Sequence, residues 1–369
     1  MPIHLSVPGR TELAGNHTDH QGGHVLAAAI DRFLACEAEP CGEAATLASE
    51  GFGECSVSLG ALDKAFSTPG TAEALLRGVL EYLKNEGYPV GGFRAKVQSG
   101  IPAGAGLSSS AAFGVLVGRI ENELYCGGTI PALTLAKAAR YAENAHFGKP
   151  CGLMDQCACA FGGVSFIDFR EEMPAVETIR TRLFAPEYRL LTADTGGSHQ
   201  DLTGDYAAIP AEMRAAAAYF GKGRLRDVPE AEFRAALPEL RKAVSDRAVL
   251  RSLHFYGEER RVPAMAQALK AGDAAAYLRL MDESGRSSAE YLQNQYAGTE
   301  QPIPLALALC REALGRDGAA RVHGGGFAGM VQILAPAERV GALKNALEPV
   351  FGPGSVKELQ IVSFQEGTK

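Results

Sequence analysis

Several features that would place this chain in a familiar class are missing from its sequence. There is no run of about 18 apolar residues, so a membrane-spanning helix is not expected. The opening residues, MPIHLSVPGR, lack the apolar segment of a secretory signal. No basic stripe occurs, and a net charge of −7 with a pI of about 5.7 argues against nucleic-acid binding. We therefore expect a cytoplasmic protein whose partners include neither a membrane nor a nucleic acid.

Paired cysteine spacing is also missing. The chain has eight cysteines, and no two of them follow the CxxC pattern of zinc sites and redox motifs. Zinc is therefore not expected, and reduced thiols are the default in a cytoplasmic protein.

The length and composition are those of a globular protein with more than one domain. At 369 residues the chain exceeds what one hydrophobic core usually serves. Its 46% apolar and 21% charged residues are typical of folded chains. We expect an α+β fold with two domains, residues 1–185 and 186–369.

Hydrophobic periodicity predicts a mixed first half and a helix-rich second half. Strands are expected at residues 4–7, 25–40, 55–62, 93–97, 163–168, 188–195, 319–323, 329–334 and 356–364. Helices are expected at residues 71–87, 111–125, 131–148, 205–221, 229–244, 260–288, 304–315 and 337–347, with another opening near residue 151.

The stretch IPAGAGLSSSAAFG, residues 101–114, has the composition of a phosphate-binding turn. Its two glycines, Gly104 and Gly106, permit backbone angles that let the chain approach a ligand closely. The following serines open a predicted helix, whose N–H groups and positive dipole end suit a phosphate. The stretch matches neither the Walker A pattern nor the dinucleotide fingerprint. The alternative is an ordinary loop with a serine helix cap.

A second polar stretch, residues 9–20, reads GRTELAGNHTDH. It places a cation, two acids, an amide and two histidines between glycines. A hydroxyl-rich small molecule needs such a mixture of donors and acceptors. Two alternatives are open: a surface turn, and a metal site formed by His17, Asp19, His20 and His24.

Two further segments carry single polar features. In CGLMDQ, residues 151–156, Asp155 is either a helix cap or a carboxylate placed for function. Glu143, on the preceding predicted helix, would by default be an exposed acid. In RVHGGGF, residues 321–327, three glycines join two predicted strands. Backbone or ligand can approach such a turn closely, and the alternative is a loose loop.

Taken in this order, the segments resemble the GHMP family of small-molecule kinases, and most of all its galactokinase branch. PGRTELAGNHTDHQGG resembles the galactokinase signature, and IPAGAGLSSSAA is similar to the family's phosphate-binding loop. CGLMDQ resembles the segment with the catalytic aspartate, and RVHGGGFAG resembles the C-terminal glycine motif. DTGGSHQDLTGDYAAIP is also similar to a galactokinase segment, so the resemblance covers nearly the whole chain.

The resemblance implies the GHMP kinase fold, with an N-terminal half like ribosomal S5 domain 2 and a ferredoxin-like C-terminal half. It implies transfer of the γ-phosphoryl group of ATP to the anomeric hydroxyl of a sugar, with Mg²⁺ as the metal. Asp155 would accept or orient the hydroxyl proton, and Arg10 would stabilise the aspartate and the transferring charge. Ser108 and Glu143 would hold Mg²⁺.

The resemblance also implies two sets of ligand-binding residues. Those for ATP are Gly104, Ala105, Gly106, Leu107, Ser108, Ser109 and Ser110. Those for the sugar are Glu12, Asn16, His17, Asp19, Gly152 and Tyr206. The galactokinase pattern has asparagine at position 12 and glutamate at position 16, whereas this chain has Glu12 and Asn16.

The resemblance makes galactose the leading substrate, with galacturonate or another sugar as the alternative for a sugar 1-kinase. A non-catalytic galactokinase-like sugar sensor is a further alternative, but it would need a broken catalytic set. ATP and a small sugar are the expected partners. The oligomeric state is open, with a monomer favoured.

Overall fold

The structure is a computed structural model that describes residues 2–49, 53–101, 107–184, 186–196, 202–296 and 298–363. The chain divides into two compact units, each built from separate segments of the sequence. The first unit comprises residues 1–11, 28–165 and 362–369, and the second comprises residues 12–27 and 166–361. Helices and strands occur in both, which confirms the expected α+β class.

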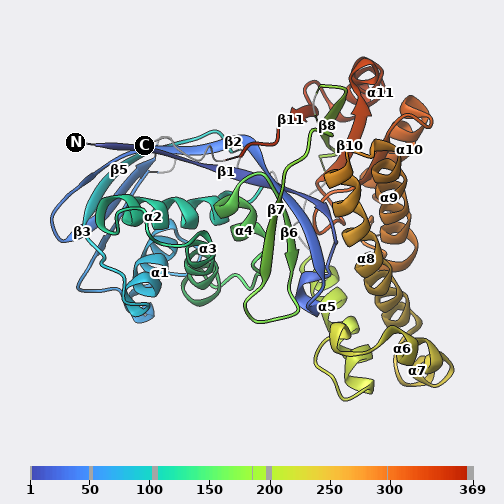
Figure 1. Ribbon diagram of the computed structural model, residues 1–369, viewed down its shortest axis with the longest axis horizontal. Helices are drawn as coiled ribbons and strands as arrows, with labels where there is room; N and C mark the ends of the chain where they lie inside the picture. The colour runs from blue at the N-terminus through green and yellow to red at the C-terminus, as the bar shows by residue number, and fades with distance from the viewer. Residues whose placement is uncertain are drawn as a thin grey trace. The chain divides into compact units, whose positions relative to one another are not determined.

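A seven-stranded sheet runs in the order β4-β3-β5-β2-β6-β7, with β1 paired to β2 (Figure 1). Its strands are β1 (Ile3–Ala14), β2 (His24–Pro40), β3 (Ala44–Ser49), β4 (Gly53–Ser58), β5 (Phe93–Ser99), β6 (Val164–Asp168) and β7 (Ala175–Ile179). Strands β3, β4 and β5 belong wholly to the first unit, whereas β1, β2 and β6 contribute residues to both units. The β3–β5 pair is parallel, and the β2–β5 pair is antiparallel.

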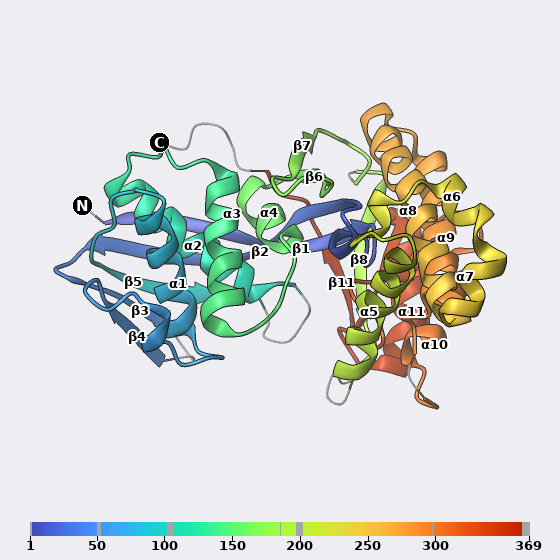
Figure 2. The same cartoon turned by 90° about the horizontal axis from the view of Figure 1, so that it is seen from below.

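Helices of the first unit cover one face of its strands, as Figures 1 and 2 show. They are α1 (Ala72–Asn85), α2 (Ser109–Tyr125), α3 (Ala132–Tyr141) and α4 (Met154–Phe161), with a 3₁₀ turn η2 (Lys64–Phe66) and a π-helical segment η3 (Ala142–Phe147). Helix α1 begins where the Thr71 hydroxyl accepts the N–H of Ala74 at 3.2 Å. Its leucines and Val79 form the buried stripe that the helical spacing predicts.

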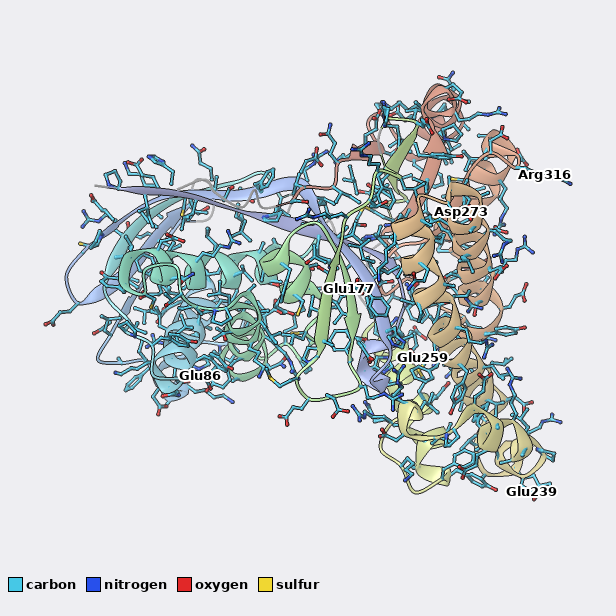
Figure 3. The ribbon with its side chains drawn as sticks, in the orientation of Figure 1. Glu86, Glu177, Glu239, Glu259, Asp273 and Arg316 are labelled. Carbon is cyan, nitrogen blue, oxygen red and sulfur yellow. The ribbon has the colours of Figure 1, made fainter. Side chains whose placement is uncertain are left out.

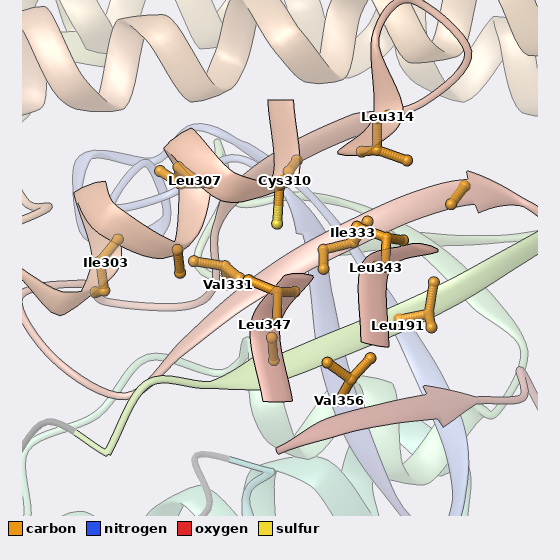
Figure 4. Packing of buried hydrophobic residues seen from close by; sticks show 14 of the residues in the cluster. Leu191, Ile303, Leu307, Cys310, Leu314, Val331, Ile333, Leu343, Leu347 and Val356 are labelled. Carbon is orange, nitrogen blue, oxygen red and sulfur yellow. The ribbon is translucent and has the colours of Figure 1, made fainter. Parts of the chain in front are cut away.

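A four-stranded antiparallel sheet organises the second unit, in the order β11-β8-β10-β9. Its strands are β8 (Tyr188–Asp194), β9 (Ala319–Val322), β10 (Met330–Pro336) and β11 (Val356–Leu359). Helices α10 (Pro302–Leu314) and α11 (Val340–Phe351) pack on this sheet through an apolar cluster (Figure 4). Leu307, Cys310, Ile333 and Leu347 lie in that cluster.

Further helices of the second unit are α5 (Thr203–Tyr219), α6 (Glu230–Ala235), α7 (Leu237–Ala243), α8 (Asp246–Ala271) and α9 (Ala274–Ser287). Of these, α5 to α8 contribute to a second apolar cluster that contains Met213, Phe233 and Phe255. Shorter segments are η1 (Asp19–Gln21), η4 (Leu225–Asp227), the π-helical η5 (Ser288–Leu292) and η6 (Ala337–Arg339). Among the described residues, no helix has the length and apolar character to cross a membrane.

Most expected elements are confirmed, and the differences have physical causes. Strand β1 continues through residues 8–14, beyond the strand expected at residues 4–7, because its polar side chains find buried partners in the folded chain. The helix expected at residues 260–288 is two helices, since Gly272 adopts a left-handed conformation and Asp273 caps the second helix. Strands β3 and β7 were not predicted from the sequence.

Candidate active site

Asp155 lies in the first turn of α4, where its side chain faces two groups of the first unit. Arg10 Nε donates to Asp155 Oδ1 at 2.6 Å, and the Ser108 hydroxyl donates to Oδ2 at 2.5 Å. The residue at the N-cap position is Leu153, so Asp155 is not the helix cap that was one alternative. Strand β1, helix α2 and helix α4 thus bring a cation, a hydroxyl and a carboxylate together.

The charge of Asp155 is fixed by these neighbours. Burial alone would raise the pKa of its carboxyl, but the Arg10 charge and the hydrogen bonds from Arg10 and Ser108 outweigh burial. The net result is a pKa below the ordinary value, so Asp155 is ionised at neutral pH.

Ser108 immediately precedes α2 and adopts a left-handed backbone, with φ of 60° and ψ of 51°. A non-glycine residue in this region carries strain, which is common at functional sites. Its hydroxyl caps no N–H of the helix because it binds Asp155 instead. Leu107 is buried, and its carbonyl accepts the N–H of Arg10 at 3.3 Å. The expected phosphate-loop residues Gly104, Ala105 and Gly106 lie outside the described residues.

Glu143 is buried in the π-helical segment η3, with 1% of its surface exposed. Its carboxylate accepts a hydrogen bond from the Ser110 hydroxyl and another from Gln156 Nε2 at 2.6 Å. The Cys151 thiol lies 3.0 Å from the same carboxylate, and the exposed Lys149 ammonium lies 3.7 Å from it. Glu143 is therefore not the exposed helix acid that we expected by default.

The donor set near α2 suits Mg²⁺ in type, because its oxygens come from a carboxylate and from hydroxyls. The structure divides the serines between two acids: Ser108 faces Asp155, and Ser110 faces Glu143. Across the part of the chain that is described, no three His, Cys, Asp or Glu side chains form a group that could hold a metal ion. His24 lies in a charged cluster instead, 3.3 Å from Asp168 and 3.2 Å from Glu259, which Figure 3 labels.

An apolar cavity of about 300 Å³ lies beside the N-terminus of α2 in the first unit. Ser109 and Ser110 border it. Its apolar lining includes Leu34, Leu47, Cys55, Leu75, Val97 and Phe113. A flat, weakly polar ring system such as a nucleobase matches these walls, with the helix N-terminus next to it.

In the second unit, polar side chains meet the carbonyl groups of the glycine turn at residues 324–326. Asn16 Nδ2 donates to Gly324 O, and His17 Nε2 lies 3.0 Å from Gly325 O. Asn294 Nδ2 donates to Gly325 O at 3.1 Å, and the Tyr206 hydroxyl donates to Gly326 O at 2.5 Å. The glycine turn is therefore not the loose loop of the alternative interpretation, since all three carbonyls are bound.

The histidines of this region are uncharged at neutral pH. Burial lowers the pKa of all three histidines. The pKa falls to about 3 for His20 and to about 4 for His254. For His17 it is also below the ordinary value. Because Gly325 O can only accept, His17 Nε2 carries the proton and its Nδ1 is left as an acceptor. His254 similarly donates from Nε2 to Asn16 O at 3.1 Å and faces the Ser287 hydroxyl through Nδ1 at 2.9 Å.

Glu12 and Asn16, the two residues that are exchanged relative to the galactokinase pattern, are both buried. The carboxylate of Glu12 lies 3.0 Å from Arg321 Nη2, and Arg321 also donates to Leu13 O at 2.7 Å. Asn16 Oδ1 is buried and has no hydrogen-bond partner within the described residues. Its amide nitrogen is already bound, so the free group of Asn16 is an acceptor.

The two other expected sugar residues are at the surface. Asp19 is partly exposed in η1, and Gly152 is exposed just before α4. Sequence reasoning gave no role to Arg321, Gln156 or Asn294. Arg321 lies in RVHGGGF and Gln156 in CGLMDQ, so their positions in these motifs could have indicated a role. No sequence pattern indicated Asn294.

The groups in the two units indicate a class of protein. The first unit holds an ionised carboxylate, an arginine and hydroxyls at a helix N-terminus, which are the groups that phosphoryl transfer needs. The second unit holds neutral donors and acceptors of the kind that read a hydroxyl-rich molecule. These two sets of groups are the ones that a phosphotransferase acting on an alcohol needs.

Comparisons with known proteins agree with this class. Residues 74–163 match the family described as GHMP kinases N terminal domain, and residues 2–40 match the galactokinase galactose-binding signature. The galactokinase of Streptomyces coelicolor is 33% identical over 356 residues, covering 95% of this chain and 89% of the relative. The galactokinase of Thermococcus kodakarensis is 36% identical, covering 87% and 86% of the two chains.

Solved structures support the same fold. A galactokinase of Lactococcus lactis, solved with galactose, aligns with a TM-score of 0.85 over 98% of this chain and 94% of that one, at 24% identity. A mevalonate kinase aligns with a TM-score of 0.67 over 98% and 99% of the two chains, at 16% identity. The chain belongs to the galactokinase family of the GHMP kinases, and it is a sugar kinase that uses ATP.

Proposed function

We propose that this chain transfers the γ-phosphoryl group of ATP to the C1 hydroxyl of galactose. The observation that carries the proposal is the ionised Asp155, held by Arg10 and Ser108 at the N-terminus of α2. Curated galactokinases that cover most of the chain support galactose as the sugar.

In this mechanism Asp155 orients the attacking hydroxyl and accepts its proton as the phosphoryl group leaves ATP. Phosphoryl transfer depends mainly on positioning and on neutralising charge, so few groups suffice. Arg10 keeps the pKa of Asp155 low, which makes the carboxylate a permanent acceptor at neutral pH rather than a strong base. Arg10 also stabilises the charge that spreads over the transferring group.

ATP would bind in the first unit. The N–H groups at the start of α2, together with residues Gly104–Ser110, would cradle the phosphates. The apolar cavity beside Ser109 and Ser110 would take the adenine ring. Glu143, with the hydroxyls of Ser108 and Ser110, would hold Mg²⁺, which supplies charge neutralisation on the phosphates when bound.

The sugar would be read mainly by uncharged side chains, with Asp19 as an acid of the set. His17 offers an acceptor, Tyr206 a hydroxyl and Asn16 an amide oxygen, while Asp19 and Gly152 complete the set. Glu12 would act through Arg321, because its carboxylate is engaged in a buried ion pair. An acceptor at Asn16 suits a sugar hydroxyl, which donates, better than a carboxylate, which only accepts.

Galacturonate is the second candidate, because position 16 lacks the acid that would repel a uronate. The test is an ATP-consumption screen over galactose, galacturonate, arabinose, glucose and N-acetylgalactosamine at equal concentration. We expect galactose to give the highest kcat/KM. A higher value for galacturonate would reverse the order of the two sugars and leave the kinase assignment standing.

A further inference from the structure

The segment that carries Glu143 has an unusual backbone. Helix α3 ends at Tyr141 and continues as the π-helical segment η3 (Ala142–Phe147), which closes at Gly148 with φ of 81°. The carbonyl of Glu143 accepts the N–H groups of both Gly148 and Lys149. A π-helical turn is rare and is frequently found at functional sites.

His146 anchors this turn to groups other than the catalytic ones. It is buried to 1% exposure, and both ring nitrogens are engaged. Nδ1 lies 2.6 Å from the Ser67 hydroxyl, and Nε2 lies 2.7 Å from Glu81 Oε2. Because a carboxylate oxygen only accepts, Nε2 is the donor in the second bond.

Helix α1 is shaped to receive the turn. A Cβ on Gly78 would lie 2.6 Å from Ala142 Cα and 3.0 Å from His146 Cδ2, so only glycine permits this close approach. The Glu81 carboxylate, one helical turn further along α1, also accepts the Tyr141 hydroxyl at 2.7 Å. The N–H of Gly70 donates to Phe147 O at 3.0 Å. These contacts fix η3 against α1.

Glu143 lies on the same turn, three residues before His146, and its carboxylate accepts hydrogen bonds from Ser110 and Gln156. A shift of the turn would therefore displace the carboxylate from the start of α2. We propose that His146 is a positioning residue: bound by Ser67 and Glu81, it sets the π-helical turn so that Glu143 faces the metal and phosphate region. This inference rests on the proposed role of Glu143 in holding Mg²⁺.

The experiment measures how much Mg²⁺ tightens nucleotide binding, rather than activity. Isothermal titration calorimetry gives the Kd of a non-hydrolysable ATP analogue with excess Mg²⁺ and with EDTA, and the ratio of the two values reports the metal site. Outer partners of metal ligands typically contribute about tenfold or more to metal affinity, so we expect His146→Leu to lower this ratio about tenfold. The Kd in EDTA and the Kd for galactose stay within about twofold of the wild-type values, because neither depends on Glu143.

Matched variants separate the possible causes. His4→Leu makes the same change at an exposed histidine of the first unit and leaves the ratio unchanged. His146→Gln retains a donor near the Nε2 position and keeps most of the ratio, because the bond to the Glu81 carboxylate is charge-assisted. Thermal unfolding shows whether His146→Leu is folded. If it is not, Ser67→Ala takes its place: this variant removes one hydrogen bond at a half-buried position, and we expect it to lower the ratio about threefold.

The outcomes also distinguish this inference from the proposed function. An unchanged ratio in Glu143→Gln would overturn the metal role of Glu143 itself. A lowered ratio in Glu143→Gln with an unchanged ratio in folded His146→Leu, or in Ser67→Ala, would overturn the positioning role of His146. Equal weakening of nucleotide binding in EDTA and of galactose binding would also overturn it, since His146 would then act on the fold as a whole.

Discussion

The buried polar groups around Asp155 in the first unit are charged, whereas the side chains that contact the glycine turn of the second unit are neutral. Around Asp155, an arginine and two hydrogen bonds hold a carboxylate in its ionised form despite burial. Around the glycine turn, burial keeps His17 and His254 uncharged, and their donors are spent on backbone carbonyls. The difference indicates a division of labour, in which one cluster manages the charge of phosphoryl transfer and the other reads hydroxyl groups.

Removing the charge of the first cluster should give the largest effect. Asp155→Asn keeps the shape of the side chain but removes the acceptor charge, and we expect kcat to fall by about 10² to 10⁴-fold. Thermal unfolding checks that the variant is folded, and Asp63→Asn, at an exposed acid of the same unit, serves as the control. Turnover near the wild-type rate in the folded Asp155 variant would refute its catalytic role.

Adding a charge to the second cluster is the converse test. The resemblance to galactokinases implies that the residue at position 16 faces the C6 group, so Asn16→Glu should repel the carboxylate of galacturonate. Two like charges about 4 Å apart cost roughly 4 kcal/mol at an effective dielectric near 20, or up to about a thousandfold in affinity. The measurement is the ratio of kcat/KM for galactose to that for galacturonate, which we expect to rise.

Asn16→Gln is the matched control, because it has the size of glutamate without its charge. A similar ratio in both variants would trace the effect to size, and an unchanged ratio in Asn16→Glu would mean that position 16 does not face C6. Either result would remove the specificity argument while the kinase assignment stood.

The neutral cluster also predicts how stability depends on pH. The pKa of His254 is about 4 in the folded chain and near 6.5 when unfolded, so the unfolded state takes up the proton first as the pH falls. Its contribution to stability is complete above pH 6.5 and is lost between pH 6.5 and about 4. The gap between these values is worth roughly 3 kcal/mol.

Chemical denaturation at pH 7, 6 and 5 measures this dependence. We expect His254→Gln to flatten the fall in the free energy of unfolding, whereas His4→Gln at an exposed histidine should leave it unchanged. An equal slope in His254→Gln and the wild type would show that this histidine is not held neutral by the fold.

The features that could be predicted from the sequence are those that depend on neighbouring residues in the chain. Helix α1 followed from the helical spacing of its apolar residues, and the four motifs identified the kinase family in outline. The expected strand at residues 4–7 was too short, because a run with Arg10 and Glu12 does not show the alternation of a strand until their partners are known. Those partners, Asp155 and Arg321, lie 145 and 309 residues away in the chain.

The details of the sites were less predictable for the same reason. No local pattern indicates that Glu143 occupies a π-helical turn, since that turn depends on contacts with Ser67 and Glu81. The serine run predicted donors near a phosphate but not their division between Asp155 and Glu143. Such choices are made by tertiary packing, which the sequence encodes only through the whole fold.

Tyr206 offers the smallest and most selective test of the neutral cluster. Its hydroxyl donates to Gly326 O at 2.5 Å, and its ring meets Phe327 edge to face with centroids 5.2 Å apart. Tyr206→Phe keeps the ring contact and removes the hydroxyl, which is worth about 1 kcal/mol, or roughly fivefold. If that hydroxyl serves galactose as proposed, KM for galactose rises by about this factor while kcat and KM for ATP stay unchanged, the pattern of a lost uniform binding contact.

Tyr219→Phe removes a hydroxyl from an exposed tyrosine of the same helix and should change none of these constants. A lower Tm with unchanged KM for galactose would instead mean that Tyr206 only braces the glycine turn, and the sugar would then be read by His17 and Asn16 without it.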